Sequence, residues 1–95
     1  MSRVTRYKLA RGGESEFIPE SAKIIIEWPS NGHNGAAVCF GADGMLYVTT
    51  GDGTSDSDRN VVGLGIDHLL AKVMRIDVDH PSDGRAYRVP KDNPF

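Results

Sequence analysis

The chain has 95 residues, enough for one small domain with a single modest core. Eleven Lys and Arg residues against thirteen Asp and Glu residues give a formal net charge of −2, without the basic excess of a phosphate-binding surface, so we expect no nucleic-acid partner. The single cysteine, Cys39, excludes an internal disulfide and a thiolate metal site. Because it lies between Val38 and Phe40, we expect it to be a small buried hydrophobe.

Two strands are predicted in the first third of the chain. Residues 3–9 read as a short strand that ends at the polar, glycine-containing stretch 11–16. Residues 22–28 are rich in β-branched side chains and are stopped by Pro29. Trp28 is expected to pack at the end of that strand, and Ile24, Ile25 and Ile26 have no evident cover.

A β-hairpin is predicted over residues 36–50. Two apolar runs, 36–41 and 45–50, flank Asp43-Gly44, which is a strong local signal for a tight turn. The polar stretch 51–60 is expected to be an exposed loop, because its residues readily bond to their own backbone.

Further extended segments are predicted over residues 70–78 and 86–90. On the first of these, alternation places Arg75, Asp77 and Asp79 on one face of an amphipathic strand. His68 and His80 are expected to be solvated loop residues. Together the segments predict an all-β fold of antiparallel sheets, with open edges that something must cover.

Three segments resemble the glucose/sorbosone dehydrogenase family of soluble quinoproteins. They read HNGAAVCFGADGMLYVTTGDG, LLAKVMRIDVDHP and YRVPKDNPF, in that order and spacing. The family fold is a six-bladed β-propeller, so the resemblance implies a partial β-propeller, a blade-like fragment. Residues 1–30 would then supply the outer strands of one blade, and residues 31–95 most of the next.

The resemblance also implies an active site. In that family a histidine at the position of His33 is the general base, and an aspartate at the position of Asp52 orients it; Asn34 and Gly35 would contact the cofactor. The implied cofactors are pyrroloquinoline quinone (PQQ) and calcium, and the implied substrate is a sugar or alcohol. Ala36 replaces the second glycine of the family motif, and the later blades are absent, so the chain is expected to be a fragment of a PQQ-dependent sugar dehydrogenase, inactive alone.

Two other functions stay open. One is a stand-alone β-module that binds a partner or forms a homo-oligomer through its open sheet edges. The other is a small calcium-binding domain, in which Asp52, Asp56 and Asp58 would be ligands, although the loop lacks the glycine and glutamate of an EF-hand and also reads as a solvated turn.

No membrane span or signal peptide is predicted, because no window reaches about 18 apolar residues and the first residues lead into no apolar stretch. The chain as written is therefore expected in the cytoplasm, whereas the family it resembles is typically periplasmic or secreted.

Overall fold

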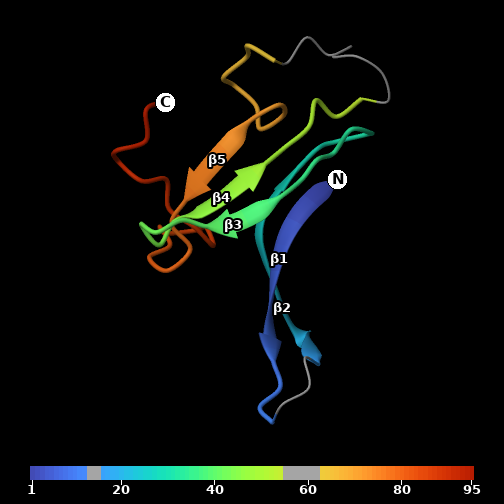
Figure 1. The fold of residues 1–95 in the computed structure, drawn as a ribbon, viewed down its shortest axis with the longest axis vertical. Helices are drawn as coiled ribbons and strands as arrows, with labels where there is room; N and C mark the ends of the chain where they lie inside the picture. Colours follow the sequence, from blue (N-terminus) through green and yellow to red (C-terminus); the bar gives the residue numbers. More distant parts are fainter. Residues whose placement is uncertain (13–15, 55–62) are drawn as a thin grey trace.

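The computed structural model describes residues 1–12, 16–54 and 63–95, and within them the chain is built from antiparallel strands (Figure 1). These strands are β1 (Ser2–Leu9), β2 (Phe17–Trp28), β3 (Val38–Phe40), β4 (Leu46–Thr49) and β5 (Val73–Ile76). They form two sheets, β1-β2 and β3-β4-β5. The predicted all-β, antiparallel class is confirmed. The described residues include no helix long and apolar enough to cross a membrane.

The first sheet is a long hairpin of β1 and β2. Its register pairs Ser2 with Trp28 at one end and Leu9 with Phe17 at the other, with two irregularities between them. β2 begins at Phe17 rather than at residue 22 as predicted, so Pro19 lies inside it. Proline is tolerated there because β2 is an edge strand with β1 as its one neighbour. The end of the hairpin farthest from Ser2 and Trp28 extends away from the second sheet (Figure 1).

The second sheet is a three-stranded meander. β3 and β4 are joined by the predicted turn, in which the Gly44 N–H donates to the Gly41 carbonyl and the Asp43 carboxylate accepts from the Met45 N–H. β4 pairs in turn with β5, so each row across the sheet holds one residue from each strand. The predicted hairpin is confirmed, with arms shorter than the apolar runs that indicated it.

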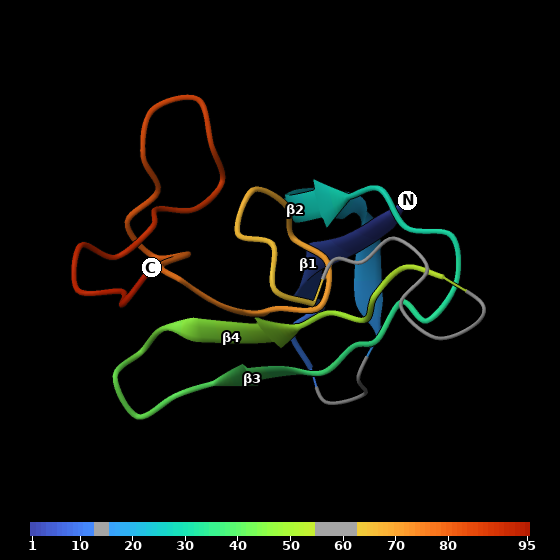
Figure 2. The ribbon, with the colours of Figure 1, turned by 90° about the horizontal axis from the view of Figure 1, so that it is seen from above.

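The core lies between the two sheets. β1 and β2 lie on one side of β3 and β4 (Figure 2). Val48 is fully buried, and the whole core cluster is Ile25, Ile26, Trp28, Leu46, Val48, Met74 and Ile76. The expectation that residues 24–26 lack a cover is therefore wrong for Ile25 and Ile26, and holds for Ile24 alone. Trp28, 3% exposed, packs at the end of its strand as predicted.

Cys39 is exposed, which corrects the prediction that it is buried. The cause is the pleat of the sheet. Cys39 pairs with Tyr47, which pairs with Arg75, so these three residues share the face turned away from the core. An apolar run indicates a strand without indicating which of its faces is covered.

The predicted strand over residues 70–78 is shorter in the structure and ends at Ile76. Asp77 then makes an isolated bridge with Arg88, through two backbone hydrogen bonds of 2.9 and 2.8 Å. Asp77 is almost fully buried, so it does not share a solvated face with Arg75 as predicted. Its carboxylate instead accepts hydrogen bonds from the backbone N–H groups of Asp79 and His80.

Candidate functional site

The segment before β3 lies beside the segment after β4. The Gly51 N–H donates to the Asn34 carbonyl at 3.1 Å, and the Gly53 N–H to the His33 carbonyl at 3.4 Å. The Asn31 N–H donates in the opposite direction, to the Gly53 carbonyl at 3.0 Å. These bonds continue the β3–β4 pairing past the ends of both strands. They bring the segments before β3 and after β4 together at one edge of the sheet, which we call the rim.

His33 and Asp52 meet on this rim, as the hairpin predicts. His33 Nδ1 lies 3.2 Å from Asp52 Oδ1, and the histidine side chain is 54% exposed whereas the aspartate is 17% exposed. Asp52 Oδ1 also accepts hydrogen bonds from the Thr54 N–H at 3.0 Å and the Thr54 hydroxyl at 3.2 Å. A carboxylate held in this way fixes the orientation of the imidazole beside it. The roles of general base and orienting residue stay predictions.

The close approach of the two segments depends on Gly51. A Cβ atom at this position would overlap the carbonyl of His33 and lie 3.1 Å from the Gly35 nitrogen. Since both of those groups are backbone, neither can move aside by changing a rotamer. The absence of a side chain at residue 51 is therefore what lets the rim form.

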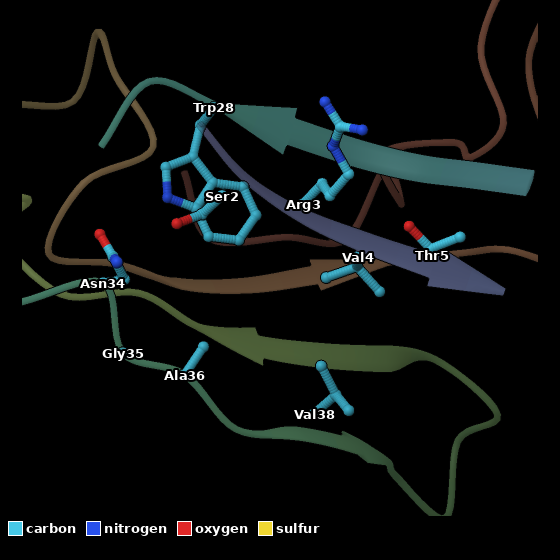
Figure 3. A pocket seen from close by; sticks show the side chains of 9 residues that line it. All are labelled: Ser2, Arg3, Val4, Thr5, Trp28, Asn34, Gly35, Ala36 and Val38. Atoms are coloured by element: carbon cyan, nitrogen blue, oxygen red, sulfur yellow. The ribbon is translucent and has the colours of Figure 1, made fainter. Parts of the chain in front are cut away.

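Asn34 and Gly35, predicted to bind a cofactor, line a groove between this rim and β1 (Figure 3). The groove has a volume of about 480 Å³ and is lined by Ser2, Arg3, Val4, Thr5, Trp28, Asn34, Gly35, Ala36 and Val38. We call it the β1 groove. In this view the Trp28 indole overlaps Ser2, and the indole nitrogen is on the side of Asn34.

The Trp28 indole nitrogen is a buried donor, and the described residues provide it with no hydrogen-bond acceptor. An unpaired buried N–H is unfavourable, typically by about 1 to 3 kcal/mol. A ligand acceptor would remove this cost only if the atoms that cover the nitrogen moved aside. Sequence patterns identified Trp28 only as a packing residue, and nothing in them indicated the unpaired donor.

The predicted calcium ligands are described only in part. Asp56 and Asp58 lie outside the described residues, so the structure does not test them. Asp52 is described, and its Oδ1 atom faces His33 and Thr54. Within residues 1–12, 16–54 and 63–95 no group of three His, Cys, Asp or Glu side chains is placed to hold a metal ion. The predicted binding of PQQ and calcium is untested.

A polar cluster on the outer face of the second sheet was not predicted. Arg75 Nε donates to Asp43 Oδ2 at 3.0 Å and to the Tyr47 hydroxyl at 3.2 Å. Its Nη1 donates to Asp92 Oδ1 at 2.8 Å and to Asn93 Oδ1 at 2.9 Å. We call these five residues the Arg75 cluster. It ties the end of the chain to the sheet.

The Arg75 cluster shifts the ionisation of its members. The pKa of Asp43 is lowered by the Met45 N–H, the Tyr47 hydroxyl and Arg75, and that of Asp92 by its hydrogen bonds to Arg75. The same two carboxylates raise the pKa of Arg75, Asp92 more than Asp43. All three groups therefore stay charged over a wide pH range.

The two remaining histidines differ. His80 is solvated, as predicted, and its Nδ1 lies 3.0 Å from Asp77 Oδ2. Burial raises the pKa of Asp77, but hydrogen bonds from the backbone and ring of His80 and from the Asp79 N–H outweigh it and lower the pKa. His68 is largely buried, with 28% of its side chain exposed, which corrects the prediction that it is solvated. Its ring lies against Gly65.

Comparison with known proteins finds relatives with another function. The chain is 38% identical over 76 residues to the HIPL1 protein of Arabidopsis thaliana, which covers 70% of the chain and 11% of that protein. It is 30% identical over 94 residues to the Hedgehog-interacting proteins of Mus musculus and Homo sapiens, which covers 97% of the chain and 13% of each protein. No protein-family model matches the chain. The chain thus spans about an eighth or less of the length of these relatives.

These relatives contradict the expected function. HIPL proteins and Hedgehog-interacting proteins are not named as sugar dehydrogenases, so the prediction of a PQQ-dependent sugar dehydrogenase fragment, an oxidoreductase and quinoprotein, is wrong. Short motifs such as those around His33 and Asp52 identify a local backbone arrangement more securely than a reaction. Similarity to a Hedgehog-interacting protein favours the alternative of a partner-binding β-module.

Proposed function

We propose that this chain is part of a β-module that binds a protein partner. Two of its relatives are named for an interaction with a protein, Hedgehog, and the similarity to them extends over 97% of the chain. A Hedgehog protein is therefore the first candidate partner. The proposal makes no use of PQQ or of a sugar substrate.

The unpaired Trp28 indole N–H in the β1 groove carries this proposal. The groove combines apolar walls, such as Val4 and Val38, with polar groups on Ser2 and Asn34. Protein segments suit such a surface because each residue offers a carbonyl acceptor beside a side chain. Tryptophan is also enriched among the residues that dominate binding energy at protein interfaces. In the complex, the atoms that cover the indole nitrogen move aside, and a backbone carbonyl of the partner accepts the Trp28 hydrogen bond.

The same proposal includes a larger architecture. The relatives are about eight to nine times longer than the stretch they share with this chain. We infer that residues 1–30 and 31–95 contribute to two neighbouring blades of a β-propeller in a protein of that length. An antiparallel meander such as β3-β4-β5 is the unit from which blades are built.

Binding to an immobilised Hedgehog protein tests the proposal, with the whole chain as the analyte. We expect saturable binding that weakens about tenfold in Trp28→Phe, which keeps a ring in the core and removes the donor. Lys8→Ala, on β1 outside the groove, is the matched control and should bind as the unchanged chain does. Thermal unfolding of each variant establishes that it is folded at the assay temperature.

Two results would contradict the proposal. One is the absence of binding at concentrations of about 100 μM, where even weak transient protein complexes form. The other is equal affinity for the unchanged chain and Trp28→Phe, which would place the contact away from the β1 groove.

A further inference from the structure

The core face of the second sheet extends beyond its cover at β3. Val38 lies in one row with Val48 and Met74, and Phe40 in the next row with Leu46 and Ile76. The β4 and β5 members of both rows are buried, whereas Val38 and Phe40 are 57% and 61% exposed. A cavity of about 190 Å³ opens beside them, lined mainly by apolar side chains that include Val4, Ile25 and Val78. The apolar face therefore lacks a cover along one strand.

The same strand has an open backbone edge. β3 has β4 as its one neighbour in the sheet. The Gly41 N–H donates to the Met45 carbonyl, and the Thr49 N–H to the Ala37 carbonyl, so residues 37, 39 and 41 direct their backbone groups toward β4. By alternation, the N–H and C=O groups of Val38 and Phe40 face outward. They are available to another strand.

Charge distinguishes β3 from the other open edges. β1 carries Arg3, Arg6 and Lys8, so pairing β1 with its own copy would bring cations together. β2 contains Pro19 and three charged residues, and β5 contains Arg75. Lysine, arginine and proline are the residues by which proteins keep sheet edges apart. β3 and the residues on either side of it, 36–42, carry no charge and no proline.

We propose that β3 pairs antiparallel with β3 of a second copy of this chain, around a two-fold axis at Cys39. This pairing places Val38 opposite Phe40 of the other copy in a hydrogen-bonded pair, twice by symmetry. Each exposed apolar side chain then covers the other on the core face, as aromatic and β-branched pairs commonly do in sheets. The two meanders become one continuous six-stranded sheet.

The proposed pairing determines the distance between the two Cys39 residues. It lies opposite its own counterpart as a non-hydrogen-bonded pair, for which the Cα atoms are about 4.5 Å apart. That separation is within the range of about 4.4 to 6.8 Å that a disulfide requires. Both thiols are on the outer face, away from the core. Disulfide formation at Cys39 is therefore a probe of this pairing, whereas the dimer itself is non-covalent.

The experiment oxidises the chain with diamide and follows the covalent dimer on non-reducing gels. Two Cys39 thiols lose two electrons and two protons to one diamide, which is reduced to its hydrazine while the disulfide forms. A chain carrying Cys39→Ser together with Asp83→Cys, which places a thiol in an exposed turn, measures random collisions. We expect the Cys39 dimer to form at least tenfold faster than the dimer of this control.

A matched pair of variants tests the edge itself. Val38→Pro removes an outward N–H from β3, and Val73→Pro removes one from the outer edge of β5, where Val73 is 71% exposed. We expect Val38→Pro to reduce cross-linking at least tenfold and Val73→Pro to leave it unchanged. Sedimentation of the Cys39→Ser chain should show a monomer–dimer equilibrium with a Kd on the order of 100 μM, since three-residue edges bury little surface.

Several results would overturn this inference. Equal cross-linking rates for Cys39 and the Asp83→Cys control would do so, and so would a rate that Val38→Pro does not change. A chain that stays monomeric would also overturn it, and if that chain binds Hedgehog protein and loses the binding in Phe40→Pro, a β3 residue outside the lining of the β1 groove, then β3 takes the partner rather than a second copy. That last result leaves the proposed function standing. A chain that dimerises but binds no Hedgehog protein would instead support the dimer and contradict the proposed function.

Discussion

Arg75 and Asn93 hold each other through two hydrogen bonds. Arg75 Nη1 donates to the Asn93 side-chain oxygen at 2.9 Å, and Asn93 Nδ2 donates back to the Arg75 carbonyl at 2.9 Å. One residue lies in the last strand of the second sheet and the other near the end of the chain. The pair therefore fastens the last residues to the sheet by both the side chain and the backbone of Arg75.

Replacing Arg75 with lysine should lower the midpoint of thermal unfolding by several degrees. Lysine keeps the charge but cannot direct separate donors toward Asp43, Asp92 and Asn93 at once, as a planar guanidinium does. Differential scanning calorimetry measures the change. Arg85→Lys, outside the Arg75 cluster, is the control. Equal shifts in the unfolding midpoint for the two replacements would show that the hydrogen bonds of the cluster do not stabilise the fold.

Acid should destabilise the chain through the Arg75 cluster and through Asp77. The pKa values of Asp43, Asp77 and Asp92 are lowered in the folded state from an ordinary value of 3.8. Carboxylates of this kind stabilise the fold above their unfolded pKa, and that contribution is lost as the pH falls through the lower folded pKa. Urea unfolding should therefore show stability that is level near neutral pH and falls below about pH 4.

Asp92→Asn tests the origin of that acid sensitivity. The variant should be less stable than the unchanged chain near neutral pH, and the difference should shrink as the pH falls below about 4, because the native carboxylate is then protonated too. Asp83→Asn, in an exposed turn, is the control. A difference for Asp92→Asn that stays constant across the pH range would argue against the charge as the cause.

Gly51→Ala should cost about 3 kcal/mol or more in unfolding free energy, because its methyl group would overlap the His33 carbonyl. Gly84→Ala is the comparison. Gly84 has a φ of +75° and no atom within 4 Å of a Cβ, so alanine there costs only the backbone strain of about 1 to 2 kcal/mol. Similar losses from the two variants, measured by urea unfolding, would contradict the close approach of residues 33 and 51.

Val48→Ala should destabilise the chain by about 2 kcal/mol, since Val48 is fully buried between the sheets. Val73→Ala removes the same two carbons from a side chain that is 71% exposed. That change should stay within about 0.5 kcal/mol. If the two variants unfold at the same urea concentration, the core does not lie where the buried residues place it.

Local signals in the sequence identified the strands and the rim. Asp43-Gly44 predicts its turn from adjacent residues, and a tight turn then determines that His33 and Asp52 return to the same end. The Arg75 cluster has no such signal. Its members are separated by 17 to 32 positions from Arg75 and meet only because β3, β4 and β5 pair in one particular register.

Faces and functions were harder to predict than strands. Cys39 and Val38 belong to one apolar run, yet they lie on opposite faces, and the core face itself lacks a cover at β3. Which face is buried depends on where β1 and β2 pack, and this is a long-range property. The prediction of function was wrong for a related reason. The motifs at His33 and Asp52 describe a backbone arrangement that proteins with different partners can share.

The β1–β2 hairpin has one end in the core and the other in solvent, so its stability changes along its length. Ile25, Ile26 and Trp28 anchor the near end, whereas Tyr7, Leu9 and Phe17 at the far end are exposed, and the Tyr7 and Phe17 rings contact each other edge to face. Amide hydrogens near Leu9 and Phe17 should therefore exchange with solvent through brief local opening, while those near Val4 and Ile26 exchange only when the whole chain unfolds. A single pair of strands would thus contain both the fastest-exchanging and the slowest-exchanging paired amides of the molecule.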